Sequence, residues 1–149
     1  YIFRLYDKAN VVIVSREGET NIPPRQFFYV FEGGLTTGER LPVKATFEFL
    51  SPLNWIIKEA IMPLSITGQI LSKASTTPRL DAILQNSSEN DIADLEVMAV
   101  LFDADGNAIN VSKTIVDIVR SESVTPFFFT WRQPFDKDPT RIEIIPKLK

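Results

Sequence analysis

The chain has 149 residues, a formal net charge of −3 and 44% hydrophobic residues, values typical of a folded globular protein. Its 16 Lys and Arg residues are scattered, which argues against a nucleic-acid partner, and no apolar run approaches the roughly 20 residues that span a bilayer. Histidine and cysteine are both absent, which excludes a Ser-His-Asp triad, a cysteine nucleophile, disulfides and a conventional zinc site.

Strand patterns dominate the first part of the chain, where apolar and polar residues alternate between turn residues. Residues 7–10 are predicted to form the turn of a hairpin, and Pro23-Pro24 is predicted to break the chain. Residues 54–60 fit either a short helical turn or a strand. The expected strands are residues 1–6, 11–15, 27–31 and 43–50.

The second part of the chain has the same character, and it contains no convincing helix pattern. Residues 86–91 are a polar turn, and residues 103–107 form a hairpin turn in which Gly106 can adopt a positive φ at no steric cost. Many short strands separated by turns are typical of a β-sandwich. The expected strands are residues 64–71, 79–85, 94–102, 108–119, 124–131 and 141–145.

The two parts of the chain also resemble each other, in four segments that match in the same order. Self-similarity of this kind marks repeated structural units. The sequence Phe-Arg-Leu-Tyr-Asp at 3–7 returns as Ala-Val-Leu-Phe-Asp at 99–103, each followed by a turn and a β-branched run. The β-branched runs end in Ser15-Arg16 and Ser112-Lys113, the aromatic blocks are 27–31 and 127–131, and the closing strands are 46–49 and 141–144, with Glu48 matching Glu143.

The repeat predicts an all-β fold of two tandem β-sandwich units, an incomplete one at 1–58 and a complete one at 64–149. The complete unit has two strands ahead of its Leu-Phe-Asp motif, whereas the first unit has no counterpart of these strands. Without them, Phe and Leu side chains and a strand edge would meet water. We therefore expect upstream sequence, a partner chain or the second unit to cover that face.

Residues 3–7 match the signature of the FxLYD domain family, and the chain resembles that family over about half of its length. The upstream Leu84-Gln85-Asn86-Ser87 and the turn at 103–107 are similar to the family's Asn-Ser and Asp-Gly turns, although the second copy has Ala99 and Phe102 in its signature. The resemblance implies that the two tandem units are immunoglobulin-like β-sandwich units, and that they belong to an exported or membrane-anchored prokaryotic protein. It implies no catalytic residue.

Two sets of residues are candidates for a site. Asp103, Asp105 and Asn107 place oxygens at alternate positions of one turn, so they are a weak calcium candidate beside the simpler interpretation as a hairpin turn. In the aromatic blocks, alternation directs three rings toward the core and leaves Phe28 and Phe128 facing outward. Exposed apolar residues often mark contacts, so these two phenylalanines are interaction candidates.

These observations lead us to expect a non-catalytic, extracytoplasmic interaction or spacer module of a bacterial cell-envelope protein, with no cofactor and no nucleic-acid partner. The expected partners are other protein chains or envelope components, and a membrane anchor is expected outside this sequence. The alternative is a subunit of a surface appendage, in which the open edge from Tyr1 to Tyr6 accepts a strand or forms a homo-oligomer. A carbohydrate-active enzyme with paired carboxylates is a weaker alternative.

Overall fold

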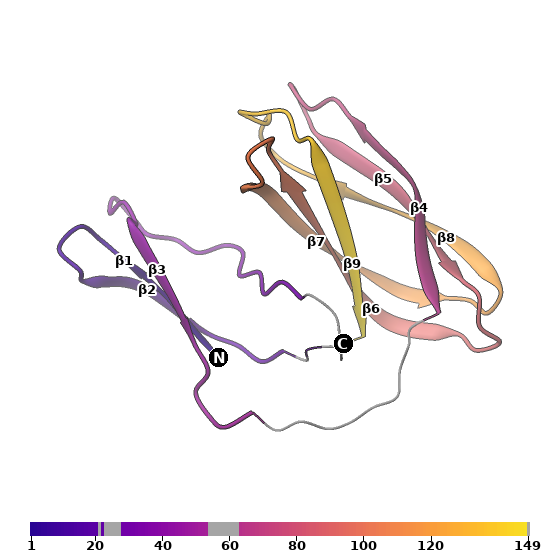
Figure 1. Ribbon diagram of the computed structural model, residues 1–149, viewed down its shortest axis with the longest axis horizontal. Coiled ribbons are helices and arrows are strands. Elements are labelled where there is room, and N and C mark those ends of the chain that lie inside the picture. Colours follow the sequence, from indigo (N-terminus) through magenta and orange to yellow (C-terminus); the bar gives the residue numbers. More distant parts are fainter. Residues whose placement is uncertain (21, 23–27, 54–62, 149) are drawn as a thin grey trace. The chain divides into compact units, whose positions relative to one another are not determined.

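The computed structural model describes residues 1–20, 22, 28–53 and 63–148, and this part of the chain is all-β (Figure 1). It has nine strands in three antiparallel sheets and contains no helix, and so none long and apolar enough to cross a membrane. The strands are β1 (Ile2–Tyr6), β2 (Val12–Glu17), β3 (Lys44–Glu48), β4 (Leu64–Ser72), β5 (Arg79–Asn86), β6 (Ile92–Phe102), β7 (Ala108–Val119), β8 (Ser123–Thr130) and β9 (Arg141–Leu148).

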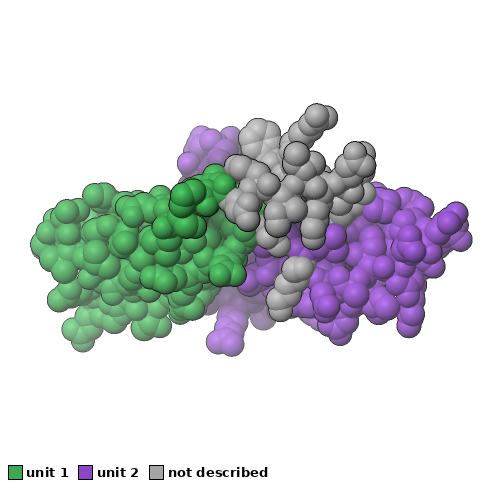
Figure 2. All heavy atoms as spheres, turned by 90° about the horizontal axis from the view of Figure 1, so that it is seen from below, with its two compact units in different colours: residues 1–59 green, residues 60–149 purple. Residues whose placement is uncertain are grey.

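The chain divides into two compact units, Tyr1–Glu59 and Ala60–Lys149, which are called unit 1 and unit 2 below (Figure 2). Unit 1 contains the sheet β2-β1-β3, and unit 2 contains the sheets β4-β5-β8 and β7-β6-β9.

Unit 2 is a sandwich of two three-stranded sheets around a single apolar core. Alternate residues of β5 supply one side of the core, because Leu80, Ala82 and Leu84 are each at most 2% exposed. The strand β6 lies in the middle of the other sheet and supplies the opposite side. Its core residues are Leu95, Val97, Ala99 and Leu101, all fully buried.

The strand β9 continues to Leu148, three residues beyond the predicted end of the last strand. It therefore includes Pro146, which pairs with Val97 of β6. Proline is tolerated there because β9 is an edge strand, so the missing N–H group faces away from the ladder.

Unit 1 contains one sheet in the described residues, with β1 in the middle. Residues 2–6 pair with β2 on one side and with β3 on the other. The expectation of an open edge from Tyr1 to Tyr6 is therefore wrong. The free edges of this sheet belong to β2 and β3, because β1 uses both of its hydrogen-bonding sides within the sheet.

The aromatic block of unit 1 also differs from its prediction. Residues 28–31 are half-buried but are not a strand, although the matching block of unit 2 lies in β8. The strand β8 exists because it pairs with β5 along its whole length, and unit 1 has no counterpart of β5 among its described residues. Residue 27, Pro23-Pro24 and residues 54–60 lie outside the described residues.

Candidate functional site

The sheet of unit 1 repeats the sheet β7-β6-β9 of unit 2 pair by pair. Leu5 pairs with Val14 and Ala45, and Leu101 pairs with Asn110 and Ile142 at the corresponding places. In each sheet the register shifts once, immediately after this leucine. The two central strands thus hold equivalent positions, including the same β-bulge.

The hairpin turns after the two central strands have the same internal hydrogen bonds. Asp7 Oδ1 accepts from the backbone N–H groups of Ala9 and Val11, at 2.9 and 3.0 Å. Asp103 Oδ1 accepts from the N–H groups two and four residues further on, at 3.1 and 2.9 Å. The fourth residue of each turn has a positive φ, 60° at Asn10 and 81° at Gly106. The aspartate of the Leu-Tyr/Phe-Asp signature is therefore a turn-forming residue.

The contacts around the third strand of each sheet repeat as well. A basic residue at the start of the strand lies over the last aromatic ring of the central strand, Lys44 over Tyr6 at 5.0 Å and Arg141 over Phe102 at 3.7 Å. The basic residue four positions earlier reaches the turn aspartate: Arg40 lies 3.7 Å from Asp7, and Lys137 lies 2.9 Å from Asp103. The two sheets therefore share side-chain contacts as well as strand order.

This register corrects two details of the predicted match between the copies. Thr46 pairs with Arg4 in unit 1, and Glu143 pairs with Val100 at the equivalent position of unit 2. Glu143 therefore corresponds to Thr46 and not to Glu48. Likewise, Arg16 pairs with Phe3 in unit 1, and Ser112 pairs with Ala99 at the equivalent position of unit 2. The pair Ser15-Arg16 therefore corresponds to Val111-Ser112, and not to Ser112-Lys113.

The copies differ in what covers the face that carries Leu5 or Leu101. In unit 2 this face lies against the sheet β4-β5-β8, and Leu101 is fully buried. In unit 1 the described residues form no second sheet, and Leu5 is half-buried. Directly paired and alternate residues share a face, so Phe3, Leu5 and Phe47 lie together on this side of β2-β1-β3.

Aromatic rings form a continuous row on this face. Phe47 stacks on Tyr1 at 5.3 Å between ring centres, meets Phe3 at 6.2 Å and meets Phe49 edge-on at 5.1 Å. Phe47 is 38% exposed and Phe49 is 47% exposed. We call the set Tyr1, Phe3, Leu5, Phe47 and Phe49 the unit 1 face. Such a row of partly exposed aromatic rings is typical of a contact surface and not of the solvent-facing side of a sheet.

The sequence predicts exposed Phe and Leu side chains in unit 1, but it does not single out Phe47 and Phe49. The signal that could have found them is the alternation Val43, Ala45, Phe47, Phe49 beside a predicted missing pair of strands.

The predicted calcium candidates lie in one turn, but the turn itself uses their atoms. Asp103 Oδ1 accepts the two backbone N–H groups described above, and Oδ2 accepts from Lys137 Nζ at 2.9 Å. The side-chain amide of Asn107 also donates to Asp103. No group of three or more His, Cys, Asp and Glu residues in the described ranges is placed to hold a metal ion. A calcium site at Asp103, Asp105 and Asn107 therefore gains no support from this geometry.

The same contacts give a pH-dependent prediction. The hydrogen bond from Lys137, together with that from the Asn107 backbone, lowers the pKa of Asp103 from 3.8 to about 2. A depressed pKa in the folded state stabilises the fold above the unfolded-state pKa, and this contribution is lost as the pH falls from about 4 to about 2. Asp103→Asn should therefore flatten the dependence of the urea midpoint of unit 2 on pH across this window.

Asp105→Asn is the matched control, because the turn uses the backbone N–H group of Asp105 and not its carboxylate. The control should keep the wild-type slope between pH 4 and pH 2. An unchanged slope in Asp103→Asn would contradict the assignment of this acid sensitivity to the Lys137–Asp103 contact.

The two interaction candidates Phe28 and Phe128 lie in different environments. Phe128 is 49% exposed on β8, and the Arg79 guanidinium lies 3.9 Å from the centre of its ring. Phe127 and Phe129 on either side of it are buried in the core, as the alternation predicts. Phe28 is half-buried in a segment that is not a strand. The two residues therefore do not form a repeated exposed pair.

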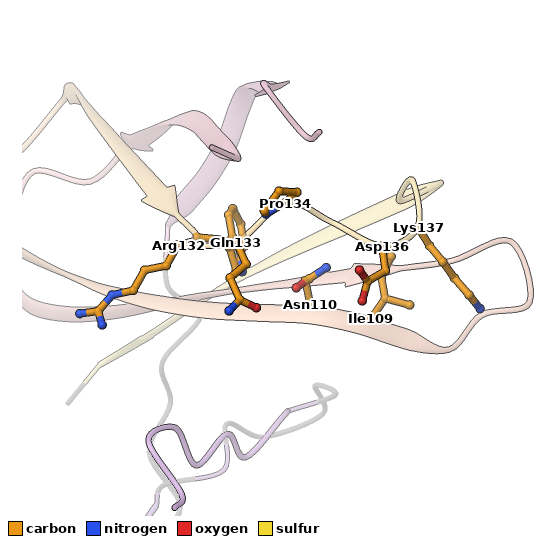
Figure 3. A pocket seen from close by; sticks show the side chains of 8 residues that line it. Ile109, Asn110, Arg132, Gln133, Pro134, Asp136 and Lys137 are labelled. Carbon is orange, nitrogen blue, oxygen red and sulfur yellow. The ribbon is translucent and has the colours of Figure 1, made fainter. Parts of the chain in front are cut away.

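Unit 2 also has a surface hollow beside the segment after β8 (Figure 3). Its aromatic wall is fixed, because Trp131 donates its indole N–H to the Val111 carbonyl and meets Phe135 edge-on at 5.1 Å. Among its lining residues, all within the described part of the chain, Asp136 is the single carboxylate. A glycoside hydrolase site requires two carboxylates that flank the scissile bond. The lining residues are Ile109, Asn110, Trp131, Arg132, Gln133, Pro134, Asp136 and Lys137.

Comparison of the chain with protein-family models, with curated proteins and with solved structures finds no match.

Proposed function

We propose that the chain is a non-catalytic interaction module of a bacterial cell-envelope protein, acting outside the cytoplasm. The unit 1 face carries this proposal. A sheet whose twin in unit 2 is buried in a sandwich core presents a row of aromatic rings, with Phe47 and Phe49 more than one-third exposed. Burying such rings against a partner is a strong source of binding free energy.

The cell-envelope part of the proposal rests on the resemblance to the FxLYD domain family. The structural roles of the signature support the resemblance, since Asp7 and Asp103 organise equivalent turns and Leu5 and Leu101 occupy equivalent positions. A motif that forms the fold in both copies agrees with a family that carries no catalytic residues.

A second candidate function is that of a subunit in an assembly built by strand addition. The free edges of β2 and β3 favour it, because they border the unit 1 face, and Val12 on β2 is 43% exposed. In this second candidate function, a strand of the partner pairs with an edge of the sheet and does not cover its face. The paired-carboxylate enzyme is the weakest candidate, since the lining of the hollow offers Asp136 alone.

Site-specific photo-crosslinking tests the proposed function. The full chain carries p-benzoyl-phenylalanine at position 47 and is irradiated with detergent-solubilised envelope proteins of the producing bacterium. We expect one discrete covalent adduct, because the unit 1 face is buried against a particular partner.

The same photoreactive residue at position 70 is the control, since Ile70 is 64% exposed on the edge strand β4 of unit 2. An interaction module predicts an adduct at position 47 and not at position 70. No adduct at either position, or the same mixture of adducts at both, would contradict the proposal.

A further inference from the structure

The surface hollow of unit 2 has a volume of about 540 Å³ and lies where edge strands of the two sheets of this unit meet (Figure 3). Its described lining residues belong to the start of β7 and to residues 131–137, the segment that follows β8. The volume falls within the usual range of sites for small organic ligands. The chemistry of the lining therefore decides which ligand the hollow can accept.

The apolar wall of the hollow is fixed by the fold of unit 2. Trp131 donates its indole N–H to the Val111 carbonyl at 3.3 Å, and its ring meets Phe135 edge-on and Phe129 at 6.4 Å between ring centres. Pro134 is a further apolar residue of the lining. A wall that is already ordered loses little conformational entropy when a ligand binds.

Four polar side chains of the lining are free to bind a ligand. None of them makes a side-chain hydrogen bond or an ion pair with another residue in the part of the chain that the structure describes. Lys137 differs from them, because its ammonium group is held by Asp103 at 2.9 Å. The four are Asn110 and Gln133, whose amides lie in the middle of the row in Figure 3, and Arg132 and Asp136 on either side of them.

The repeat shows that the fold does not require the amide of Asn110. Asn110 pairs with Leu101 on β6, and Val14 pairs with Leu5 at the equivalent position of unit 1. Asn110 and Val14 are both half-buried. Valine thus serves this position in unit 1, whereas unit 2 has an amide there that no described residue satisfies. No described side-chain nitrogen or oxygen is both buried and without a partner, so this amide reaches solvent at the hollow.

The charges and hydrogen-bonding groups of the lining favour a neutral ligand that is rich in hydroxyl groups. Asp136 is a single carboxylate, which is too few for a hard cation, and its charge opposes the binding of an anion beside Arg132. The amides of Asn110 and Gln133 both donate and accept hydrogen bonds, as hydroxyl groups do. The C–H face of a pyranose ring is apolar and makes dispersion contacts with an aromatic wall. A sugar ring therefore matches both the apolar and the polar part of this lining.

We propose that the hollow of unit 2 binds a neutral sugar ring of a glycan. The C–H face of the ring packs against Trp131 and Pro134, and its hydroxyl groups exchange hydrogen bonds with Asn110 and Gln133. The sugar is bound and not cleaved, since the lining offers one carboxylate and glycoside hydrolysis requires two. This proposal goes beyond the proposed function, because it uses unit 2 and does not depend on the unit 1 face.

The first experiment is an NMR titration of the full chain with the methyl glycosides of glucose, galactose, mannose and N-acetylglucosamine. We expect saturable binding of at least one of them, with a dissociation constant of about 1 mM or lower. The side-chain amide signals of Asn110 and Gln133 should shift, and nuclear Overhauser effects should connect the sugar C–H protons with the Trp131 ring. No saturable shift with any of the four glycosides would overturn the proposal.

Substitutions locate the binding surface. Asn110→Val, which introduces the side chain that Val14 has in unit 1, and Gln133→Ala should each weaken sugar binding about tenfold. Gln85→Ala is the matched control, because Gln85 is an exposed glutamine of β5 whose side chain also has no partner among the described residues. The urea midpoint of each variant shows that unit 2 is folded. Normal affinity in both Asn110→Val and Gln133→Ala, or an equal loss in Gln85→Ala, would overturn the assignment of the site to the hollow.

Charged sugars test the class of ligand. Methyl glucoside should bind at least as tightly as glucuronate and glucose 6-phosphate, because Asp136 opposes an anion in the hollow. Binding of glucuronate or glucose 6-phosphate without binding of any neutral glycoside would overturn the proposal and would show an anion site at Arg132. The photo-crosslink at position 47 reports on the other unit, so failure of sugar binding and failure of the proposed function are distinguishable.

Discussion

Leu101→Ala should lower the free energy of unfolding of unit 2 by about 3 kcal/mol, whereas Leu5→Ala should cost unit 1 about 1 kcal/mol. The two leucines hold equivalent positions in the two central strands. Leu101 is fully buried between two sheets, so its removal leaves a cavity, while Leu5 is only half-buried. Urea unfolding followed through resolved methyl NMR signals of each unit measures both values. Equal costs in the free chain would contradict the account, since they would mean that Leu5 is already enclosed.

Asn86→Ala should destabilise unit 2 by about 3 kcal/mol, a large effect for a polar residue. Asn86 is 1% exposed, and its side-chain N–H groups donate to the carbonyls of Asn90, Val119 and Arg120 at 2.8, 3.2 and 3.1 Å. Its Oδ1 accepts from the backbone and the hydroxyl of Ser88. Alanine would leave several of these buried groups without a partner. The shift of the urea midpoint measures the loss.

Asn86→Asp separates donation from acceptance in the same side chain, because it keeps the oxygen that accepts from Ser88 and loses the donor. We expect it to be at least as harmful as alanine, since a carboxylate would then face three carbonyl oxygens. Asn90→Ala is the matched control, because Asn90 contributes its backbone carbonyl to this network. A neutral Asn86→Ala would show that the network does not hold the end of the sandwich together.

The same asparagine also heads an Asn-Ser-Ser glycosylation pattern in the sequence. Its burial and its three donated hydrogen bonds leave no accessible amide for a glycan. The Asn-Ser turn that contributes to the family resemblance is thus a structural element of unit 2.

The strands of unit 2 could be predicted from the sequence to within a few residues, because each has apolar residues at alternate positions and a partner strand in the same unit. The turn at 103–107 could be predicted for a similar local reason, since Gly106 adopts the positive φ that the turn requires. The all-β class of the chain follows from these local patterns, and the described residues bear it out.

Features that depend on pairing with a strand far away in the sequence could not be predicted in the same way. Residues 28–31 have the composition of β8 but not its ladder, so an aromatic run alone did not specify a strand. The match of Glu48 to Glu143 was wrong by two residues, because a shift of two keeps every side chain on the same face of a strand. The central place of β1 depends on its pairing with β3, almost 40 residues away.

Amide hydrogen exchange in the free chain tests the central claim most directly, namely that the sheet β2-β1-β3 presents as a contact surface the face whose counterpart in unit 2 is buried in the sandwich core. The claim predicts that the amides of Phe3 and Leu5 in β1 exchange much faster than those of Ala99 and Leu101 in β6, although both strands are central in their sheets. Equal protection of the two strands would contradict it.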